Sequence, residues 1–433
     1  MRKIIFTILL LPIAGWLSGQ ELLTLRKAVS TGLENNFGIS IAENSVQIAR
    51  QNATPGNAGM LPTLEVNAGY LYGYSDARVN VVTGSELDDP SANSHLATAG
   101  IGLTWTLFDG LKMFITYDKL KSLEAISELS SKITVENTVA KIMGSYYEIV
   151  RQVRVTAIYT EQVSISRFRL ELAKMRFETG TGSELEYLKA KVELNADIAA
   201  LSDQQTHYKN SKITLNDLLS RDVNTLFEVK DTILLSKVLQ YDSLRVSMKK
   251  ANRHILMAVA QKRVAGMELQ TARANQWPTL DLYAGYDYYR LETQANFIQY
   301  NRHVGPSVGL SLSMKLFDGM NLHRQVKNAA ISFQTGELEI KQIENRLEAF
   351  LARIYNEYRT QLEMITFEQE NLLLAMKNMD IARESYAIGV ISSLQLREVQ
   401  EDLLYANTRL VTAEFKAKLT ETELLLLCGE LVR

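Results

Sequence analysis

Histidine and cysteine are the residues of this 433-residue chain best suited to ligate a metal, transfer a proton or act as a nucleophile. The five histidines show no metal-ligand spacing: His95, His207, His254, His303 and His323. The one cysteine, Cys428, excludes an internal disulfide and is expected to pack as a small apolar residue. The sequence also lacks a Cys-x-x-Cys pair and a phosphate-binding glycine loop. It therefore predicts no metal, no cofactor and no enzymatic activity.

The elements that position these residues occur in two similar copies. The letters Leu-Phe-Asp-Gly at Leu107–Gly110 return at Leu316–Gly319. Gly180 lies as far beyond the first of these segments as Gly389 lies beyond the second. Repeats of this size come from duplication of a whole structural unit, so each copy should have the same structural role. The two repeats predicted from this pattern are 20–235 and 236–433.

Residues 1–19 have the features of a secretory signal peptide. Arg2 and Lys3 form a basic start, an apolar stretch follows, and Ser18-Gly19 is a small-residue cleavage site. No other segment approaches the run of about 20 apolar residues that a membrane helix needs. The net charge of −2 at pH 7 is too small to indicate a nucleic acid partner. The sequence thus predicts an exported protein that does not bind nucleic acid.

Long helices are predicted where proline is absent, over 91–277 and 307–433. Apolar residues there recur in steps of three and four, as in a packed helical seam: Val139, Ile142, Tyr146, Ile149 and Val153. The helices are expected at about 24–60, 110–220, 243–276 and 319–428. The equal spacing of the two glycine pairs predicts two rods of the same length, which end at Gly180 and Gly389.

Two β-hairpins are predicted between the helices, at about 62–108 and 278–317. Apolar residues there alternate with polar or small ones, for example Leu64, Val66, Ala68, Tyr70, Tyr72 and Tyr74. Alternation over about ten residues, with aromatic residues near the ends, is the signature of outer-membrane strands. A soluble hairpin packed on helices would show the same alternation. Polar turns are expected at the hairpin tips, over 75–96 and 290–303.

The junctions between helices and strands also match between the copies. Pro62 and Pro278 lead from helix into strand, where a missing N–H is tolerated. Asp109-Gly110 and Asp318-Gly319 lie where strands return to helices, and the two carboxylates are expected to cap those helices. The first copy is longer between its proline and Phe108, which predicts a surface loop there.

Residues 221–242 break the helical pattern and link the copies, and we expect them to form a small girdle on the rods.

Four strands are too few to close a membrane barrel, which starts at about eight strands. Lipid tolerates no open strand edge, so several protomers would have to pool their hairpins. The alternative is an exported structural or adhesive coiled coil without a pore. That alternative accounts for the helical periodicity, but not for two equally placed hairpins, and the pattern therefore favours a channel.

The ordered set of these segments resembles the TolC-type outer-membrane efflux protein family. Leu25-Arg26-Lys27-Ala28 and Asn35-Asn36 carry the resemblance, together with both proline-led strands, both Leu-Phe-Asp-Gly junctions and both helix-tip glycines. It covers essentially the whole mature chain. The resemblance implies a mainly α fold with a membrane β-barrel. Three protomers would give four strands each to one 12-stranded barrel, continued by a long α-helical tunnel in the periplasm.

The same resemblance implies a function and a set of partners. The protein would be a passive exit duct in the outer membrane of a Gram-negative bacterium, within a tripartite efflux or type I secretion system. Drugs, metals, small molecules or proteins would pass through it. The implied partners are two further copies of the chain, outer-membrane lipid, a periplasmic membrane-fusion adaptor and an inner-membrane pump of the RND or ABC type.

Family members contact the adaptor and close the tunnel mouth near the helix-tip turns. The positions that carry over are Gly180, Glu186, Tyr386, Gly389, Gln395, Arg397 and Glu398. Glu186 occupies a position where the family often has Asp, and Tyr386 matches a tip tyrosine that hydrogen-bonds across helices in related channels. Glu398 lies at the position where related channels carry a ring of acidic residues. The chain departs from the pattern at Gln395, which occupies a second acidic site, and at Ile391, where some relatives have a gating arginine that Arg397 could replace.

Elementary electrostatics supports a role for this region. Three copies of Glu398 around a narrow axis would repel anions, favour cations and strain the closed state. The same charged residues could also be solvated on helix surfaces, and Tyr386 could be an ordinary packing aromatic. Gly180 and Gly389 are expected to end their helices in the left-handed conformation.

Overall fold

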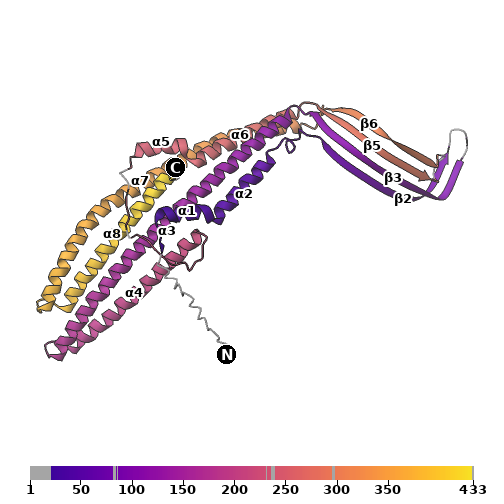
Figure 1. Cartoon of the computed structure of the whole chain (residues 1–433). Helices are drawn as coiled ribbons and strands as arrows, with labels where there is room; N and C mark the ends of the chain where they lie inside the picture. The colour runs from indigo at the N-terminus through magenta and orange to yellow at the C-terminus, as the bar shows by residue number, and fades with distance from the viewer. Residues whose placement is uncertain are drawn as a thin grey trace, which may run out of the picture. The chain divides into compact units, whose positions relative to one another are not determined.

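The computed structural model describes residues 21–80, 84, 86–230, 232–235, 239–294 and 298–431 (Figure 1). The signal peptide predicted at 1–19 lies outside the described residues. The chain forms two compact units. One contains the described residues up to Ser40, Thr134–Lys250 and those from Leu347 onward, and the other contains Ile41–Ile133 and Ala251–Arg346. Each unit draws on both sequence repeats, so the repeats are not separate compact bodies.

Four long helices dominate the chain: α3 (Lys112–Glu178), α4 (Glu184–Leu218), α7 (Asn321–Ala387) and α8 (Ser393–Leu427). Helices α3 and α7 both have 67 residues, and α4 and α8 both have 35. At 1.5 Å per residue each longer helix extends over roughly 100 Å. The equal lengths confirm the prediction of two matched rods. Among the described residues, no helix combines the length and the apolar character needed to cross a membrane.

The helices predicted at 24–60 and 243–276 are each interrupted, so the prediction of two continuous helices was wrong. The described helices in these regions are α1 (Leu25–Asn35), α2 (Phe37–Asn52), α5 (Tyr241–Ala251) and α6 (Arg253–Ala274). Helix α2 also ends well before the predicted boundary, and turns follow it.

An asparagine causes each interruption. Asn36 has a backbone ψ of 120°, and Asn252 has a ψ of 121°, both extended and incompatible with a helix. The carboxamide oxygen of Asn36 accepts a hydrogen bond from Ile39 N at 3.2 Å, and that of Asn252 accepts one from His254 N at 3.0 Å. Each asparagine thus begins the second helix as its N-cap.

The four long strands form one antiparallel sheet in the order β2-β3-β5-β6. They are β2 (Thr63–Asn80), β3 (Glu86–Phe108), β5 (Thr279–Thr293) and β6 (Tyr300–Ser313). The strands continue through most of the segments predicted as turns at 75–96 and 290–303. Polar residues there pair across strands, as Arg78 does with Asp88 at 2.9 Å. The extra residues of the first copy therefore lengthen its strands, and the predicted loop was wrong in its extent.

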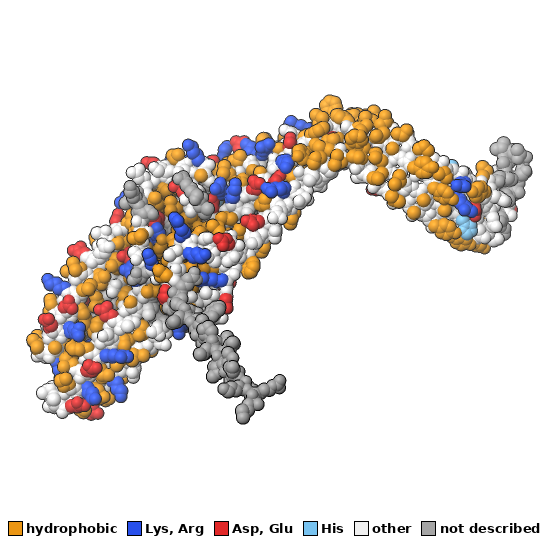
Figure 2. All heavy atoms as spheres, viewed as in Figure 1, with side chains coloured by type: hydrophobic (Ala, Val, Ile, Leu, Met, Phe, Trp, Pro, Cys, Tyr) orange, Lys and Arg blue, Asp and Glu red, His pale blue; other side chains and the backbone are white. Residues whose placement is uncertain are grey.

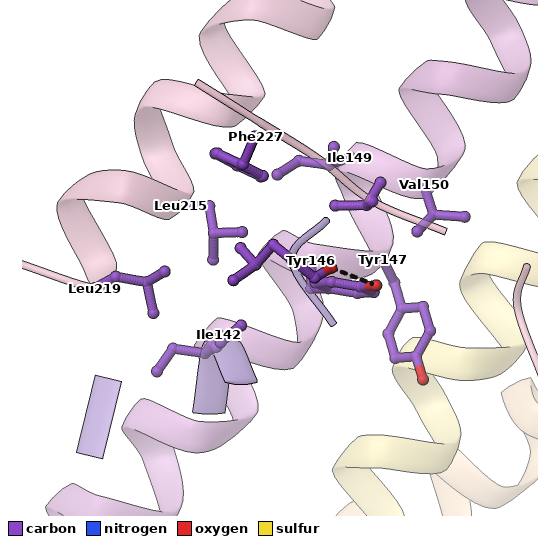
Figure 3. Close-up of a cluster of buried hydrophobic side chains, with 11 residues drawn as sticks. Ile142, Tyr146, Tyr147, Ile149, Val150, Leu215, Leu219 and Phe227 are labelled. Carbon is purple, nitrogen blue, oxygen red and sulfur yellow. Dashed lines mark hydrogen bonds between the residues drawn. The ribbon is translucent and has the colours of Figure 1, made fainter. Parts of the chain in front are cut away.

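The segment between the repeats packs into a buried cluster (Figure 3). Strand β4 (Phe227–Glu228) pairs in parallel with β1 (Glu21–Leu22). Phe227 is fully buried with Ile142 of α3 and Leu215 of α4. Burial of a large aromatic ring is a strong stabilising contribution, so Phe227 anchors this segment to the helices.

Candidate functional site

The two turns that join the long helices have the same backbone geometry. Gly180 and Gly389 have φ values of 73° and 82°, in the left-handed region that glycine tolerates. Thr181 N donates to Arg176 O at 2.8 Å, and Val390 N donates to Ser385 O at 2.9 Å. These bonds close the same helix-ending motif in both copies. The matched turns support the expectation that the glycines end the helices.

A serine begins the helix after each turn. Ser183 Oγ accepts from Glu186 N at 3.2 Å, and Ser392 Oγ accepts from Gln395 N at 3.2 Å. The side chain of Gln395 also accepts from Ser392 N at 2.9 Å, which completes a capping box. Gln395 therefore has a local structural role, and the Ser-x-x-Gln spacing was the sequence signal for it.

Tyr386 of α7 and Glu186 of α4 lie together beside the turns. The Tyr386 side chain is fully buried, and its hydroxyl donates to Glu186 Oε1 at 3.3 Å. Burial raises the pKa of Tyr386, and the nearby Glu186 carboxylate raises it further. The ring also packs with Leu396 and Met379, so the residue is both a packing aromatic and a hydrogen-bond donor across helices.

Arg176 completes this cluster, and the sequence-based prediction missed it. Its guanidinium lies 4.6 Å from the centre of the Tyr386 ring and also donates to the Tyr386 carbonyl oxygen. Arg176 precedes Gly180 by one helical turn, so its position in the motif was the available signal. We call Tyr386, Glu186 and Arg176 the tip cluster.

Arg397 and Glu398 are adjacent in sequence and differ in environment. Arg397 Nη1 pairs with Asp197 at 2.7 Å, and its Nε pairs with Glu401 at 2.7 Å. Glu398 is exposed. Ile391, at the position of the gating arginine in some relatives, is partly buried against the Tyr386 hydrophobic cluster. Arg397 thus binds within its own chain, and it does not join the tip cluster.

A buried polar layer, formed by Arg169, Ser166, Asp197, Gln400 and Arg397, links α3, α4 and α8. Arg169 Nη1 donates to Gln400 Oε1 at 2.8 Å, and Gln400 Nε2 donates to Ser166 Oγ at 2.8 Å. Ser166 in turn donates to Asp197, which pairs with Arg397.

The outer end of this layer is Glu193, which accepts from Arg169. The members of the layer hydrogen-bond to one another away from water, with the buried Arg169 Nε left without a partner. The layer therefore fixes how the three helices pack. No periodic pattern indicates this layer in the sequence, since its members are distant from one another along the chain.

At the strand–helix junctions, Pro62 and Pro278 directly precede β2 and β5, as expected. Gly110 and Gly319 have φ values of 74° and 69°. A Cβ on Gly110 would lie 2.5 Å from Ala274 O, whereas one on Gly319 would have open space around it apart from an ordinary contact at 3.7 Å. The first junction is therefore much more tightly packed than the second.

The two junction carboxylates also differ. Asp318 Oδ2 accepts from Leu322 N at 2.9 Å and caps α7 as predicted. Asp109 Oδ1 is buried without a hydrogen-bond partner, so the same role for Asp109 is not observed. The sequence could not distinguish the two because the motif around them is identical.

The two faces of the sheet differ sharply in chemistry. Residues in register across the strands share a face, and the row Val66–Ile101–Tyr286–Pro306 lies on one of them. The row Asn67–Gly100–Asp287–Gly305 lies on the other. We call these the apolar face and the small face.

The large side chains of the apolar face remain in contact with solvent in the single chain. Val66 is 75% exposed and Val308 is 79% exposed. Figure 2 shows hydrophobic side chains gathered over the strands, with arginine and histidine side chains near the hairpin ends. An apolar surface of this extent requires a partner or a lipid environment.

The sequence is similar to known proteins over most of its length. The family model described as outer membrane efflux protein matches residues 28–221 and 244–430. The chain is 18% identical to the outer membrane protein TolC of Escherichia coli over 96% of this chain and 84% of that protein. It is 26% identical to protein CyaE of Bordetella pertussis over 77% of this chain and 70% of that protein.

Solved structures share the fold at low sequence identity. The outer-membrane channel OprN superposes with a TM-score of 0.77 at 17% identity, over 94% of this chain and 89% of that one. The outer membrane protein VceC of Vibrio cholerae superposes with a TM-score of 0.76 at 17% identity, over 94% of this chain and 96% of that one.

Proposed function

The chain belongs to the outer membrane efflux protein family, and from that premise we propose that it is the exit duct of a tripartite efflux or type I secretion system. It lies in the outer membrane of a Gram-negative bacterium, with a periplasmic helical part. Its family consists of channel proteins rather than enzymes. The observation that carries the proposal is the four-stranded sheet with one apolar face and one small, polar face.

The edges of the sheet explain why one copy would be insufficient. Within the described part of the chain, strand β2 pairs only with β3, and β6 pairs only with β5. Unpaired strand edges are not tolerated in lipid, so β2 of one copy would pair with β6 of the next. Three copies would close a 12-stranded barrel with the apolar face toward lipid and the small face toward the lumen. Twelve strands lie within the range of known membrane barrels.

Conduction through this duct would be passive. Glycines on the small face, such as Gly100 and Gly102, leave the lumen wide. Asp287 adds a carboxylate on the same face. An inner-membrane pump of the RND or ABC type would supply the energy and select the cargo, and a periplasmic adaptor would dock at the helix turns. The cargo classes consistent with such a duct are drugs, metals, small molecules and proteins.

The gate would lie at the periplasmic helix turns. The bond between Tyr386 and Glu186 ties α7 to α4, and the polar layer ties α8 to α3 and α4. Opening would require the α7–α8 pair to move away from the α3–α4 pair, which breaks these bonds. Two discrete hydrogen-bonded arrangements are the usual basis of such a switch.

The first experiment is single-channel conductance of the purified full-length protein in a planar lipid bilayer. We expect a stable conductance from a trimer, and a higher open probability for the double variant Glu186→Ala/Tyr386→Phe. Tyr405→Phe, which alters an exposed tyrosine of α8, is the matched control. A stable pore insensitive to the double variant would overturn the gate but not the duct. A well-folded trimer without conductance, even in the double variant, would contradict the duct and favour a structural or adhesive role.

A further inference from the structure

The apolar face changes character toward the hairpin ends. On β5 its side chains run from Leu280 to Tyr288 and are followed by Arg290. The apolar band of a membrane barrel is about 25 Å tall and its strands tilt by about 40°. The ten steps from Leu280 to Arg290, about 34 Å along the strand, therefore span about 26 Å of height, and Arg290 lies where this band ends. The last rows of the face are Tyr70–Ala97–Arg290–Arg302 and Tyr72–His95–Glu292–Tyr300.

Two arginines face each other directly at this level. Arg290 of β5 and Arg302 of β6 are register partners and therefore neighbours on the same face. Like charges directly opposite each other destabilise a sheet. Glu292 pairs with Arg290 through the Nε–Oε1 contact of 3.0 Å, so this carboxylate balances the charge of one of the two guanidinium groups. Arg302 lies 5.7 Å from the centre of the Tyr288 ring. The pair therefore keeps an excess positive charge that an anion would neutralise.

A hollow accompanies the excess charge. Its volume is about 310 Å³, and its lining is Tyr70, His95, Ala97, Tyr288, Arg290 and Glu292. The hydroxyl of Tyr70 lies 2.7 Å from His95 Nδ1, so two polar groups meet at one wall. The aromatic rings belong to the type of girdle that marks a membrane–water interface. The hollow thus combines aromatic rings with the Arg290–Glu292 pair, and Arg302 lies beside it as the register partner of Arg290.

We propose that Arg290 and Arg302 bind the phosphate group of an outer-leaflet lipid, whose acyl chains lie along the apolar band below. The proposal rests on the proposed function, because it requires the apolar face to be turned toward lipid. Guanidinium groups match phosphate oxygens with paired, charge-assisted hydrogen bonds. Charge complementarity selects a phosphorylated headgroup, and the adjoining apolar band selects a lipid over a soluble phosphate.

The test is lipid retention by the full-length trimer in detergent, measured by native mass spectrometry. The probes are diphosphoryl lipid A and a dephosphorylated analogue with the same acyl chains. We expect the trimer to retain the phosphorylated lipid selectively. Arg290→Gln/Arg302→Gln should retain it about tenfold less, since charge-assisted bonds are lost. Arg324→Gln, an exposed arginine of α7, should behave as the unmodified protein.

Several outcomes would overturn the proposal. Equal retention of the two lipids would show that the phosphate is not recognised. Unchanged retention by the double variant would place the lipid elsewhere. Displacement by millimolar inorganic phosphate would show a site for the free ion. Should the double variant not assemble, Arg302→Gln alone provides the comparison, because that side chain is exposed. Bilayer conductance of the same samples distinguishes failure of the lipid site from failure of the duct.

Discussion

Arg169 of α3 donates a hydrogen bond of 2.8 Å to the side-chain oxygen of Gln400 of α8, and both side chains are withdrawn from solvent, at 1% and 0% exposure. A buried guanidinium is tolerated only when acceptors surround it. Gln400 satisfies Arg169 with its oxygen and Ser166 with its amide nitrogen. These hydrogen bonds therefore join α3 and α8, two helices from different sequence repeats.

Gln400→Leu should destabilise the helical unit by about 2–4 kcal/mol. Leucine has a similar volume, but it removes one hydrogen-bond partner from each of Arg169 and Ser166 in a buried position. The thermal midpoint of the helical circular dichroism signal measures the effect. Gln369→Leu, at an exposed position of α7, is the control. A midpoint equal to that of the unmodified protein would show that the polar layer contributes nothing to packing.

Glu398→Gln and Arg397→Gln should separate selectivity from stability. Glu398 is exposed, so its neutralisation should leave the thermal midpoint unchanged and weaken the preference for cations over anions. Arg397→Gln removes the ion-pair partner of buried Asp197 and should lower the midpoint by several degrees. Reversal potentials in a salt gradient measure the selectivity. If Glu398→Gln leaves the reversal potential unchanged, the residue does not line the conducting path.

The tip cluster should lose stability in alkaline solution. Burial, followed by the Glu186 carboxylate, raises the pKa of Tyr386 above its ordinary value of 10.0. Below that value both the folded and the unfolded protein keep this hydroxyl protonated. Above it the unfolded chain ionises first, so stability decreases as the pH rises from about 10 toward the folded pKa.

Thermal midpoints between about pH 9 and pH 11 test this linkage. Tyr386→Phe has no hydroxyl to ionise, so its midpoint should decline less than that of the unmodified protein. Tyr405→Phe should decline to the same extent as the unmodified protein, because that tyrosine is exposed. Parallel declines in all three proteins would remove Tyr386 from the alkaline transition.

The sequence predicted the elements that repeat and missed the contacts that do not. Proline-free stretches and apolar steps located the long helices, because helix periodicity is a local property. The interruptions at Asn36 and Asn252 were missed, since an asparagine can cap a helix or lie within one and only its backbone conformation decides. The hairpin turns were predicted to be longer than they are, because polar residues such as Arg78 and Asp88 pair across strands instead of forming a loop.

The candidate site divides in the same way. Resemblance located Tyr386 and Glu186, and their contact agrees with the role suggested for the tip tyrosine. Arg176 and Gln400 were missed because their partners are far along the chain, and a single sequence does not show which distant residues meet. The resemblance offers Arg397 as a substitute for the gating arginine, and the structure pairs it with Asp197 and Glu401.

The two junction glycines provide a matched pair for the final prediction. Both have positive φ, so alanine at either position should cost about 1 kcal/mol from backbone strain. Gly110→Ala should cost more, because its Cβ would lie 2.5 Å from Ala274 O and 2.8 Å from Trp277 Cβ. The backbone oxygen cannot rotate away, so the junction itself must shift. Gly319→Ala meets only an atom at 3.7 Å.

Assembly in the outer membrane should therefore distinguish the two variants. We expect Gly319→Ala to yield nearly as much heat-resistant trimer as the unmodified protein and Gly110→Ala to yield substantially less. Trimer is measured by gel mobility of membrane fractions with and without heating. Equal yields of both variants would mean that the α6–β5 segment shifts at little cost to accommodate the added methyl group. The two copies of one motif would then be mechanically equivalent despite their different surroundings.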